Sequence, residues 1–158
     1  MAGKSRSIVR EYVEAALWAL VLTLFLRAFV IQAFRIPSGS MENTLLINDR
    51  VIVNRLSGDV GRGEIVVFKG WDGATTIKRV IGIGGDKVVC CDKDGRISVN
   101  GTPLAEDSFI DPQQDCDGPM AGCSGWSATV PKGKLFVMGD NRDESADSSF
   151  HLCTADDG

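Results

Sequence analysis

Histidine is almost absent from this sequence, and so are the motifs that bind metals and nucleotides. The 158 residues contain one histidine, His151, close to the C-terminal end. The five cysteines form no C-x-x-C pair and no His/Cys cluster with the spacing of zinc ligands. No glycine-rich loop ends in Lys-Ser/Thr, as a phosphate-binding loop does. We therefore expect no metal, nucleotide or organic cofactor, and catalysis by histidine has a single candidate residue.

Beyond position 35 the chain also lacks the basic charge of a nucleic-acid-binding domain. Residues 1–35 carry five Lys/Arg against two Asp/Glu, whereas residues 36–158 carry twelve against nineteen. An acidic domain repels phosphates, so we expect no nucleic-acid partner. The residues after position 35 suffice for one globular domain with a modest core.

The N-terminal part contains a long apolar segment. Residues 12–34 are apolar at all but four positions, and a helix rising about 1.5 Å per residue over this length crosses the roughly 30 Å hydrocarbon layer. Because basic residues precede it, we expect residues 1–11 in the cytoplasm, residues 12–34 as a single transmembrane anchor and residues 35–158 as an extracytoplasmic domain of the cell membrane. A cleaved secretory signal is the alternative, but no clear small-x-small cleavage site follows Leu26.

After Ser40, short apolar runs alternate with turn residues. Asn100-Gly101 is typical of a two-residue hairpin, and Gly84-Gly85-Asp86 indicates another turn. Only residues 42–46 look helical after the anchor. The pattern predicts a mainly β domain, an antiparallel barrel or sandwich. The expected strands cover residues 50–56, 64–69, 75–83, 87–91, 96–99, 127–130 and 134–138.

An extracytoplasmic domain permits disulfides. Cys116 and Cys123 enclose a small ring within a polar loop, and we predict that they pair. Cys90 and Cys91 are neighbours in an expected strand, where their side chains would point to opposite faces. We therefore expect them to be core cysteines and poor partners for each other. Cys153 has no obvious mate.

Five blocks occur in a fixed order along the chain. With them the sequence resembles the type I signal peptidases, membrane-anchored Ser-Lys proteases that remove signal peptides from exported proteins. The blocks are Pro37-Ser38-Gly39-Ser40-Met41, Asp49-Arg50-Val51-Ile52-Val53-Asn54, Gly63-Glu64-Ile65-Val66-Val67-Phe68, Lys78-Arg79-Val80-Ile81-Gly82, and Gly139-Asp140-Asn141-Arg142-Asp143-Glu144-Ser145-Ala146-Asp147.

The resemblance implies a catalytic role for four of these residues. Ser40 would attack the scissile carbonyl, and Lys78 would act as its general base, which requires burial to lower a lysine pKa from about 10.4. Ser145 matches the serine that hydrogen-bonds the lysine. The Ser40 N–H and the Ser38 hydroxyl would bind the oxyanion.

The resemblance also implies how substrate is bound. The family adds an extended peptide as a strand, with shallow pockets for small side chains one and three residues before the cut. Ile36, Met41, Leu45 and Ile77 match positions around those pockets. The partners implied are the signal peptides of secreted preproteins and the lipid bilayer, on which an apolar rim near Phe34 would rest.

Structural support is expected from Asp140, Arg142 and Asp147. The family commonly has proline at Gly84 and arginine at Ser149, so we expect Arg142 to neutralise Asp147 in this chain. The family also usually continues past its last motif with further strands, so we expect either a shortened chain or a fold that closes differently.

Three other interpretations stay open. A self-cleaving Ser-Lys peptidase of the SOS-repressor type shares the dyad spacing but is cytosolic. A catalytically inactive, membrane-tethered β module would bind exported peptides without cutting them. A triad of Ser40, His151 and Asp147 needs only the right geometry, although His151 lies where the family has no catalytic residue.

Overall fold

The computed structural model describes residues 2–56, 58–110 and 125–154, with side chains from Ile8 to Leu152. The chain folds into two compact units. The first contains residues 1–34 and 50–58, and the second contains residues 35–49 and 59–158. We call them the anchor unit and the catalytic-motif unit.

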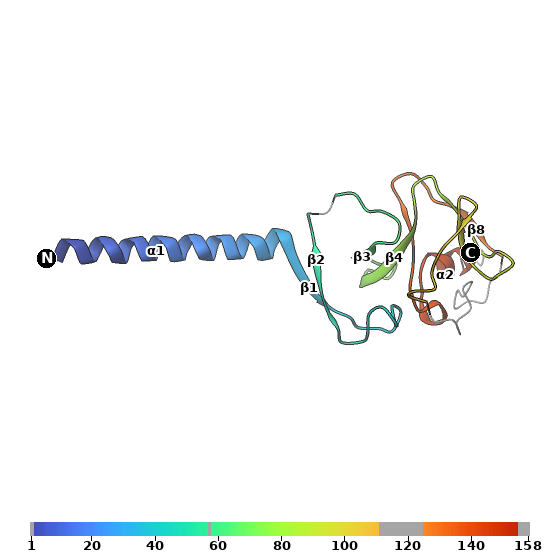
Figure 1. The fold of residues 1–158 in the computed structure, drawn as a ribbon, viewed down its shortest axis with the longest axis horizontal. Helices are drawn as coiled ribbons and strands as arrows, with labels where there is room; N and C mark the ends of the chain where they lie inside the picture. Colours follow the sequence, from blue (N-terminus) through green and yellow to red (C-terminus); the bar gives the residue numbers. More distant parts are fainter. Residues whose placement is uncertain (1, 57, 111–124, 155–158) are drawn as a thin grey trace. The chain divides into compact units, whose positions relative to one another are not determined.

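The anchor unit is a helix followed by a β ribbon (Figure 1). Helix α1 (Ala2–Phe25) continues as a π-helical segment, η1 (Leu26–Val30), and leads into β1 (Ile31–Arg35), which pairs with β2 (Arg50–Asn54). Arg55 caps the C-terminal end of the helical segment. Its backbone N–H donates to the Val30 carbonyl at 3.0 Å, and its guanidinium donates to the Ala28 carbonyl at 2.9 Å. These carbonyls would otherwise lack partners within the helix.

The apolar helical segment Ile8–Val30, 23 residues long, meets the length and composition needed to cross a membrane. The expected anchor extended to residue 34, and this boundary is too late by four residues. Residues 31–34 belong to β1, because they pair with β2.

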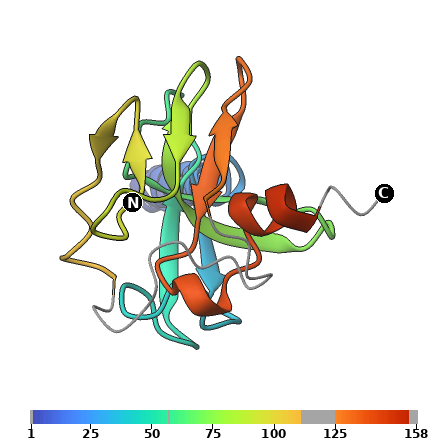
Figure 2. The ribbon, with the colours of Figure 1, turned by 90° about the vertical axis from the view of Figure 1, so that its right-hand side faces the viewer.

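The catalytic-motif unit contains two antiparallel sheets (Figure 2). One has the order β3-β4-β9 and the other the order β7-β6-β5-β8. The apolar core includes Val88, Ile97, Trp126 and Met138. The strands are β3 (Ile65–Lys69), β4 (Thr75–Ile83), β5 (Lys87–Val89), β6 (Ser98–Val99), β7 (Thr102–Pro103), β8 (Ser127–Thr129) and β9 (Leu135–Met138).

The mainly β class and all seven expected strands are confirmed, most with shorter ends than predicted. The Asn100-Gly101 hairpin is confirmed too, since both residues have positive φ (53° and 82°) and Val99 pairs with Thr102. The described residues form open sheets and no closed barrel.

Other details differ from the sequence-based expectations. Residues 42–46 form a turn followed by irregular backbone instead of a helix. Two short helices, η2 (Arg142–Glu144) and α2 (Ser148–Thr154), were not expected. At Gly84 an added Cβ would lie 2.9 Å from the Gly133 nitrogen, so the proline common in the family would not fit here.

The expectation that Cys90 and Cys91 are poor partners is wrong, because the structure joins them by a disulfide. Their expected place in the core is confirmed, since Cys90 is buried in the core cluster and Cys91 packs against it. Alternation of side chains holds only within a regular strand, and β5 ends at Val89, before either cysteine. The predicted Cys116–Cys123 pair lies outside the described residues, and nothing is described of the Cys153 side chain.

Asp86 fixes the turn between β4 and β5. Its buried carboxylate accepts hydrogen bonds from the Arg62 guanidinium, the Ile83 N–H at 2.8 Å and the Asn100 side-chain amide at 2.8 Å. The hydrogen bond from Arg62 is the main reason that the pKa of Asp86 lies well below its usual range.

We predict that Asp86→Ala lowers the unfolding free energy of the chain in detergent by about 2 kcal/mol, because it leaves buried donors without an acceptor. A depressed carboxyl pKa stabilises the fold above the unfolded value of about 4, so the difference between wild type and variant should shrink as the pH falls below that value. Denaturant unfolding checks this, with the exposed Asp94→Ala as control. Equal stability of the two variants would contradict the prediction.

Candidate active site

Ser40 and Lys78 come together in the catalytic-motif unit. Lys78 Nζ lies 2.7 Å from Ser40 Oγ, and the two groups are hydrogen-bonded. Both residues are buried, with 3% of Lys78 and 7% of Ser40 exposed. A lysine that has lost its proton at this distance could take the proton of the serine hydroxyl.

The main chain holds each residue in place. Lys78 lies in the middle of β4, opposite Val66 of β3. Ser40 lies in a turn, and its carbonyl accepts the Asn141 N–H at 3.2 Å, while the Asn141 side-chain amide donates to the Gly39 carbonyl at 3.1 Å. The serine segment is thus tied to the Gly139–Asp147 block, which lies far along the chain from it.

Gly139 allows these segments to approach. A Cβ added at Gly139 would lie 2.3 Å from the Ser40 carbonyl oxygen and 2.4 Å from Ser145 Oγ, too close for any side chain. Gly139 was expected to lie in a motif block, but no role was predicted for it. The glycine is needed because another backbone passes against it, a situation that the sequence alone does not reveal.

The buried carboxylate of Asp147 is held by neutral donors. It accepts hydrogen bonds from the Gly139 N–H (3.0 Å), the Ser145 hydroxyl (2.6 Å), and both the N–H (3.0 Å) and the hydroxyl (2.7 Å) of Ser149. Ser145 was expected to hydrogen-bond Lys78. Among the described residues its hydroxyl instead donates to Asp147 and accepts the Gly139 N–H at 3.1 Å.

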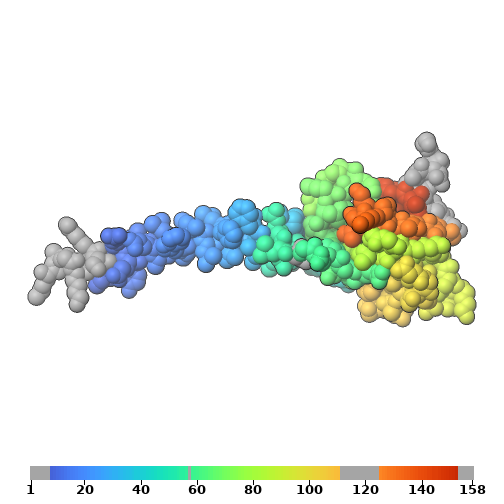
Figure 3. All heavy atoms as spheres, turned by 90° about the horizontal axis from the view of Figure 1, so that it is seen from above, coloured from blue at the N-terminus to red at the C-terminus, as the bar shows by residue number. Residues whose placement is uncertain are grey.

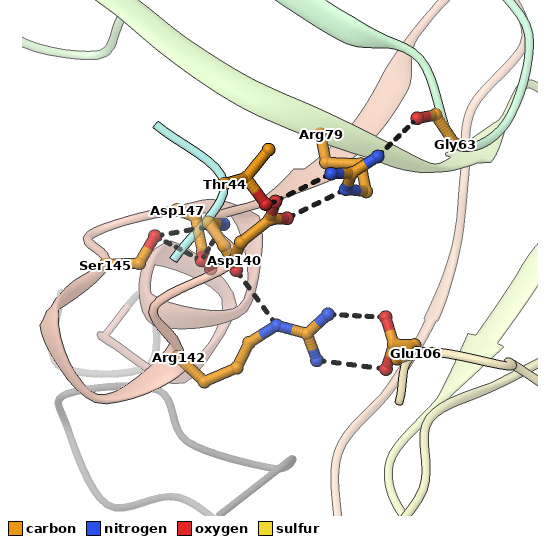
Figure 4. A network of polar contacts seen from close by, with 9 residues as sticks. Thr44, Gly63, Arg79, Glu106, Asp140, Arg142, Ser145 and Asp147 are labelled. Carbon is orange, nitrogen blue, oxygen red and sulfur yellow. Dashed lines mark hydrogen bonds and ion pairs between the residues drawn. The ribbon is translucent and has the colours of Figure 1, made fainter. Parts of the chain in front are cut away.

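Two buried ion pairs flank this carboxylate (Figure 4). Arg79 donates two hydrogen bonds to Asp140, at 2.8 and 2.7 Å, and Thr44 donates a third. Arg142, completely buried, binds the Glu106 carboxylate and donates to the Gly139 carbonyl at 2.9 Å. The expectation that Arg142 neutralises Asp147 is therefore wrong. Glu106 was missed because nothing in the loop sequence indicates its partner.

Burial is the main influence on Lys78. It lowers the pKa of the lysine, because removal from water disfavours the charged form, while the negative charges of Asp147 and Asp140 raise the pKa by a smaller amount. The net effect favours the neutral amine that a general base requires. Arg79 partly offsets the charge of Asp140, whereas the described residues give Asp147 no cationic partner.

A cleft of about 490 Å³ opens beside Ser40 and Lys78. Of the four residues predicted to bind substrate, Ile77 lines it, whereas Ile36 and Met41 are buried elsewhere and the half-buried Leu45 does not reach it. Ser38 also lines the cleft, and in the described residues neither its hydroxyl nor the Ser40 N–H has a hydrogen-bond partner.

One edge of β4 is open toward this cleft. β3 pairs with β4 from Thr75 to Arg79, but β9 pairs only with the part from Arg79 onward. The Ala74 carbonyl and the Val80 N–H both face β3, so by alternation the backbone groups of Thr75 and Ile77 face the other edge. In the described part of the chain no strand covers this edge.

The family model described as "Signal peptidase, peptidase S26" matches residues 9–155. The chain belongs to this signal peptidase family. The family is one of serine peptidases, and an N-terminal apolar helix accords with membrane anchoring.

Curated signal peptidases are similar over most of this chain. It is 35% identical over 198 residues to a signal peptidase I of Mycobacterium tuberculosis, covering 96% of this chain and 67% of that protein. It is 39% identical over 142 residues to a probable signal peptidase I-2 of Synechocystis, covering 84% of this chain and 61% of that protein. A crystal structure of a signal peptidase I from Enterococcus faecalis aligns with a TM-score of 0.47 at 27% identity, covering 59% of this chain and 86% of that one.

We predict that Gly139→Ala destabilises this signal peptidase family member by about 2–3 kcal/mol, because the new methyl group must displace the Ser40 backbone or Ser145. Chemical unfolding measures the change. Gly61→Ala is the control, since its added methyl group would make only an ordinary contact, 3.7 Å from Glu64. A Gly139→Ala variant as stable as the control would show that the segments do not pack this closely.

Proposed function

We propose that this chain is a membrane-bound serine endopeptidase that cleaves N-terminal signal peptides from exported preproteins, with Ser40 as nucleophile and Lys78 as general base. The observation that carries the proposal is the buried 2.7 Å contact between Lys78 Nζ and Ser40 Oγ beside a cleft. The proposal extends the family membership to a mechanism for this chain.

The proposed reaction has two stages. Ser40 Oγ attacks the scissile carbonyl carbon while Lys78 takes its proton, and the ammonium of Lys78 then protonates the departing amine. This leaves an acyl-enzyme ester on Ser40. Lys78 next removes a proton from a water molecule, and the water oxygen attacks the ester. The ester bond to Ser40 Oγ then breaks, which releases the signal peptide with a free carboxylate, and Lys78 returns the proton to Ser40 Oγ.

Two groups are free to stabilise the oxyanion. The Ser40 N–H and the Ser38 hydroxyl have no hydrogen-bond partner within the described residues, and one such donor typically contributes about 3 kcal/mol to lowering the barrier. The carboxylate of Asp147 would stabilise the ammonium that Lys78 forms when it takes the proton.

The open edge of β4 supports binding of substrate as an extended strand. A peptide placed there could pair with the backbone groups of Thr75 and Ile77, which have no strand partner on that side in the described chain. Ile77 would contact the side chains near the cut. We further propose that α1 crosses the cell membrane with its N-terminus in the cytoplasm, so that the enzyme and its membrane-held substrates share one surface.

Loss of either member of the dyad should abolish cleavage. We predict that Ser40→Ala and Lys78→Ala each reduce the cleavage rate of a signal-peptide substrate in detergent by at least about a thousandfold. The exposed Lys87→Ala on β5 serves as the control and should cut at the wild-type rate. Full activity of the Lys78 variant would refute the base, and substrate binding without cleavage by wild type would indicate an inactive binding module.

The pH dependence should report Lys78 and its neighbour Asp147. Wild-type activity should rise with pH as Lys78 becomes neutral, with an apparent pKa below that of an ordinary lysine, because burial lowers the lysine pKa. Asp147→Asn removes a negative charge that raises this pKa, so the rise in the cleavage rate with pH should occur at lower pH in this variant. The weaker base should also lower the rate at the plateau.

The exposed Asp143→Asn is the matched control for this pH experiment, and its profile should coincide with that of wild type. Thermal unfolding of each variant separates a change in the lysine from a loss of fold. If Asp147→Asn lowered the maximal cleavage rate but left the pH at which the rate rises unchanged, Asp147 would have a purely structural role.

A further inference from the structure

The cleft beside the dyad also contains a pair of stacked rings. Trp71, in the turn between β3 and β4, lies against His151 of α2, with ring centroids 4.2 Å apart and planes 28° apart. Both residues line the cleft that holds Ser40 and Lys78. In the space-filling view of Figure 3 the atoms of α2 and of the β3–β4 turn appear on the same face.

The stacking leaves much of the Trp71 side chain uncovered. Phe68 packs edge-on against it at 6.1 Å, yet 51% of Trp71 remains exposed. Burying the rest of an indole would contribute appreciably to binding, since tryptophan offers a large apolar surface. An exposed tryptophan inside the cleft of a peptidase is therefore positioned to contact a substrate side chain.

The position of Trp71 along the β3–β4 hairpin indicates which substrate side chain its indole would contact. A strand rises about 3.3 Å per residue, so Thr75 lies about 10 Å from Lys78 along β4. Trp71 precedes Thr75 in the same hairpin. Because Trp71 lies beyond Thr75, a peptide extended along the open edge of β4 from the dyad toward Thr75 would bring a residue about four or five positions from the scissile bond next to the indole.

Two carboxylates line the same cleft. Asp72, which accepts the Ala74 N–H at 2.9 Å, and Glu144 of η2 both contribute to the lining, and both are exposed. The described lining contains no arginine and no lysine other than Lys78. An acidic substrate residue near Trp71 would therefore be repelled by the negative charges of Asp72 and Glu144.

We propose that Trp71, supported by His151, forms a specificity subsite that takes an apolar side chain four or five residues from the scissile bond and disfavours an acidic one. The subsite rests on the proposed function, and it adds a selection at a distance from the cut. Trp71 would touch the substrate, whereas His151 would hold the indole in position.

The test uses the full chain in detergent. The signal-peptide substrates carry Leu, Ala or Asp at the fourth or the fifth residue on either side of the cut. At one of these positions, wild type should cut the Leu substrate with a kcat/KM about tenfold above the Ala substrate, and the Asp substrate about tenfold below it. Trp71→Ala should remove the Leu preference, so that the kcat/KM values for the Leu and Ala substrates become equal within about twofold. Trp71→Phe should retain most of the preference.

Leu135→Ala is the control, because it removes an exposed apolar side chain outside the cleft and should keep the wild-type preference. Equal rates on all substrates by wild type, or a Leu preference that survives in Trp71→Ala, would overturn the subsite. Failure of the proposed function would look different, because wild type would then cut none of the substrates, or Ser40→Ala would cut them as fast as wild type.

Discussion

The hydrogen bond between Lys78 and Ser40 is the interaction on which the proposed chemistry depends. It serves catalysis only if the amine is kept dry enough to lose its proton. The fold meets this requirement by placing Lys78 in the middle of a strand, where 3% of it is exposed. Two carboxylates, Asp147 and Asp140, oppose the effect of burial. Arg79 binds Asp140, while neutral donors alone hold Asp147 among the described residues, so the Asp147 charge is available to stabilise the ammonium formed during the reaction.

Much of the fold follows from local sequence pattern. Alternating apolar residues and turn dipeptides predicted the strands, because the hydrophobic face of a strand and the backbone of a turn are both encoded locally. Residues 31–34 were misassigned, since an apolar stretch continuous with a helix does not reveal where pairing with β2 begins. Helix α2 is short and its position depends on tertiary contacts, so no periodic signal marked it. The separation into two open sheets also depends on long-range packing.

The candidate site was predictable to the extent that ordered motifs carry it. The motif blocks indicated Ser40 and Lys78, and the structure brings them together. The partners of the supporting residues were not predictable in the same way. Arg142 binds Glu106 because loops distant in sequence approach each other, whereas Ser145 binds Asp147, two residues further along the same loop. Gly139 is needed because the Ser40 backbone passes beside it. The Trp71–His151 pair had no sequence signal, since a hairpin turn and a C-terminal helix meet only in the folded chain.

The role of Lys78 as the base is tested most directly by an NMR titration of its side chain in the full chain in detergent, with the resonance assigned by comparison with Lys78→Arg. We expect the pKa of Lys78 to lie below the ordinary lysine value of about 10.4, because its amine is buried. A Lys78 that titrates at or above that value would show that the amine stays charged beside Ser40 and would contradict its role as the base.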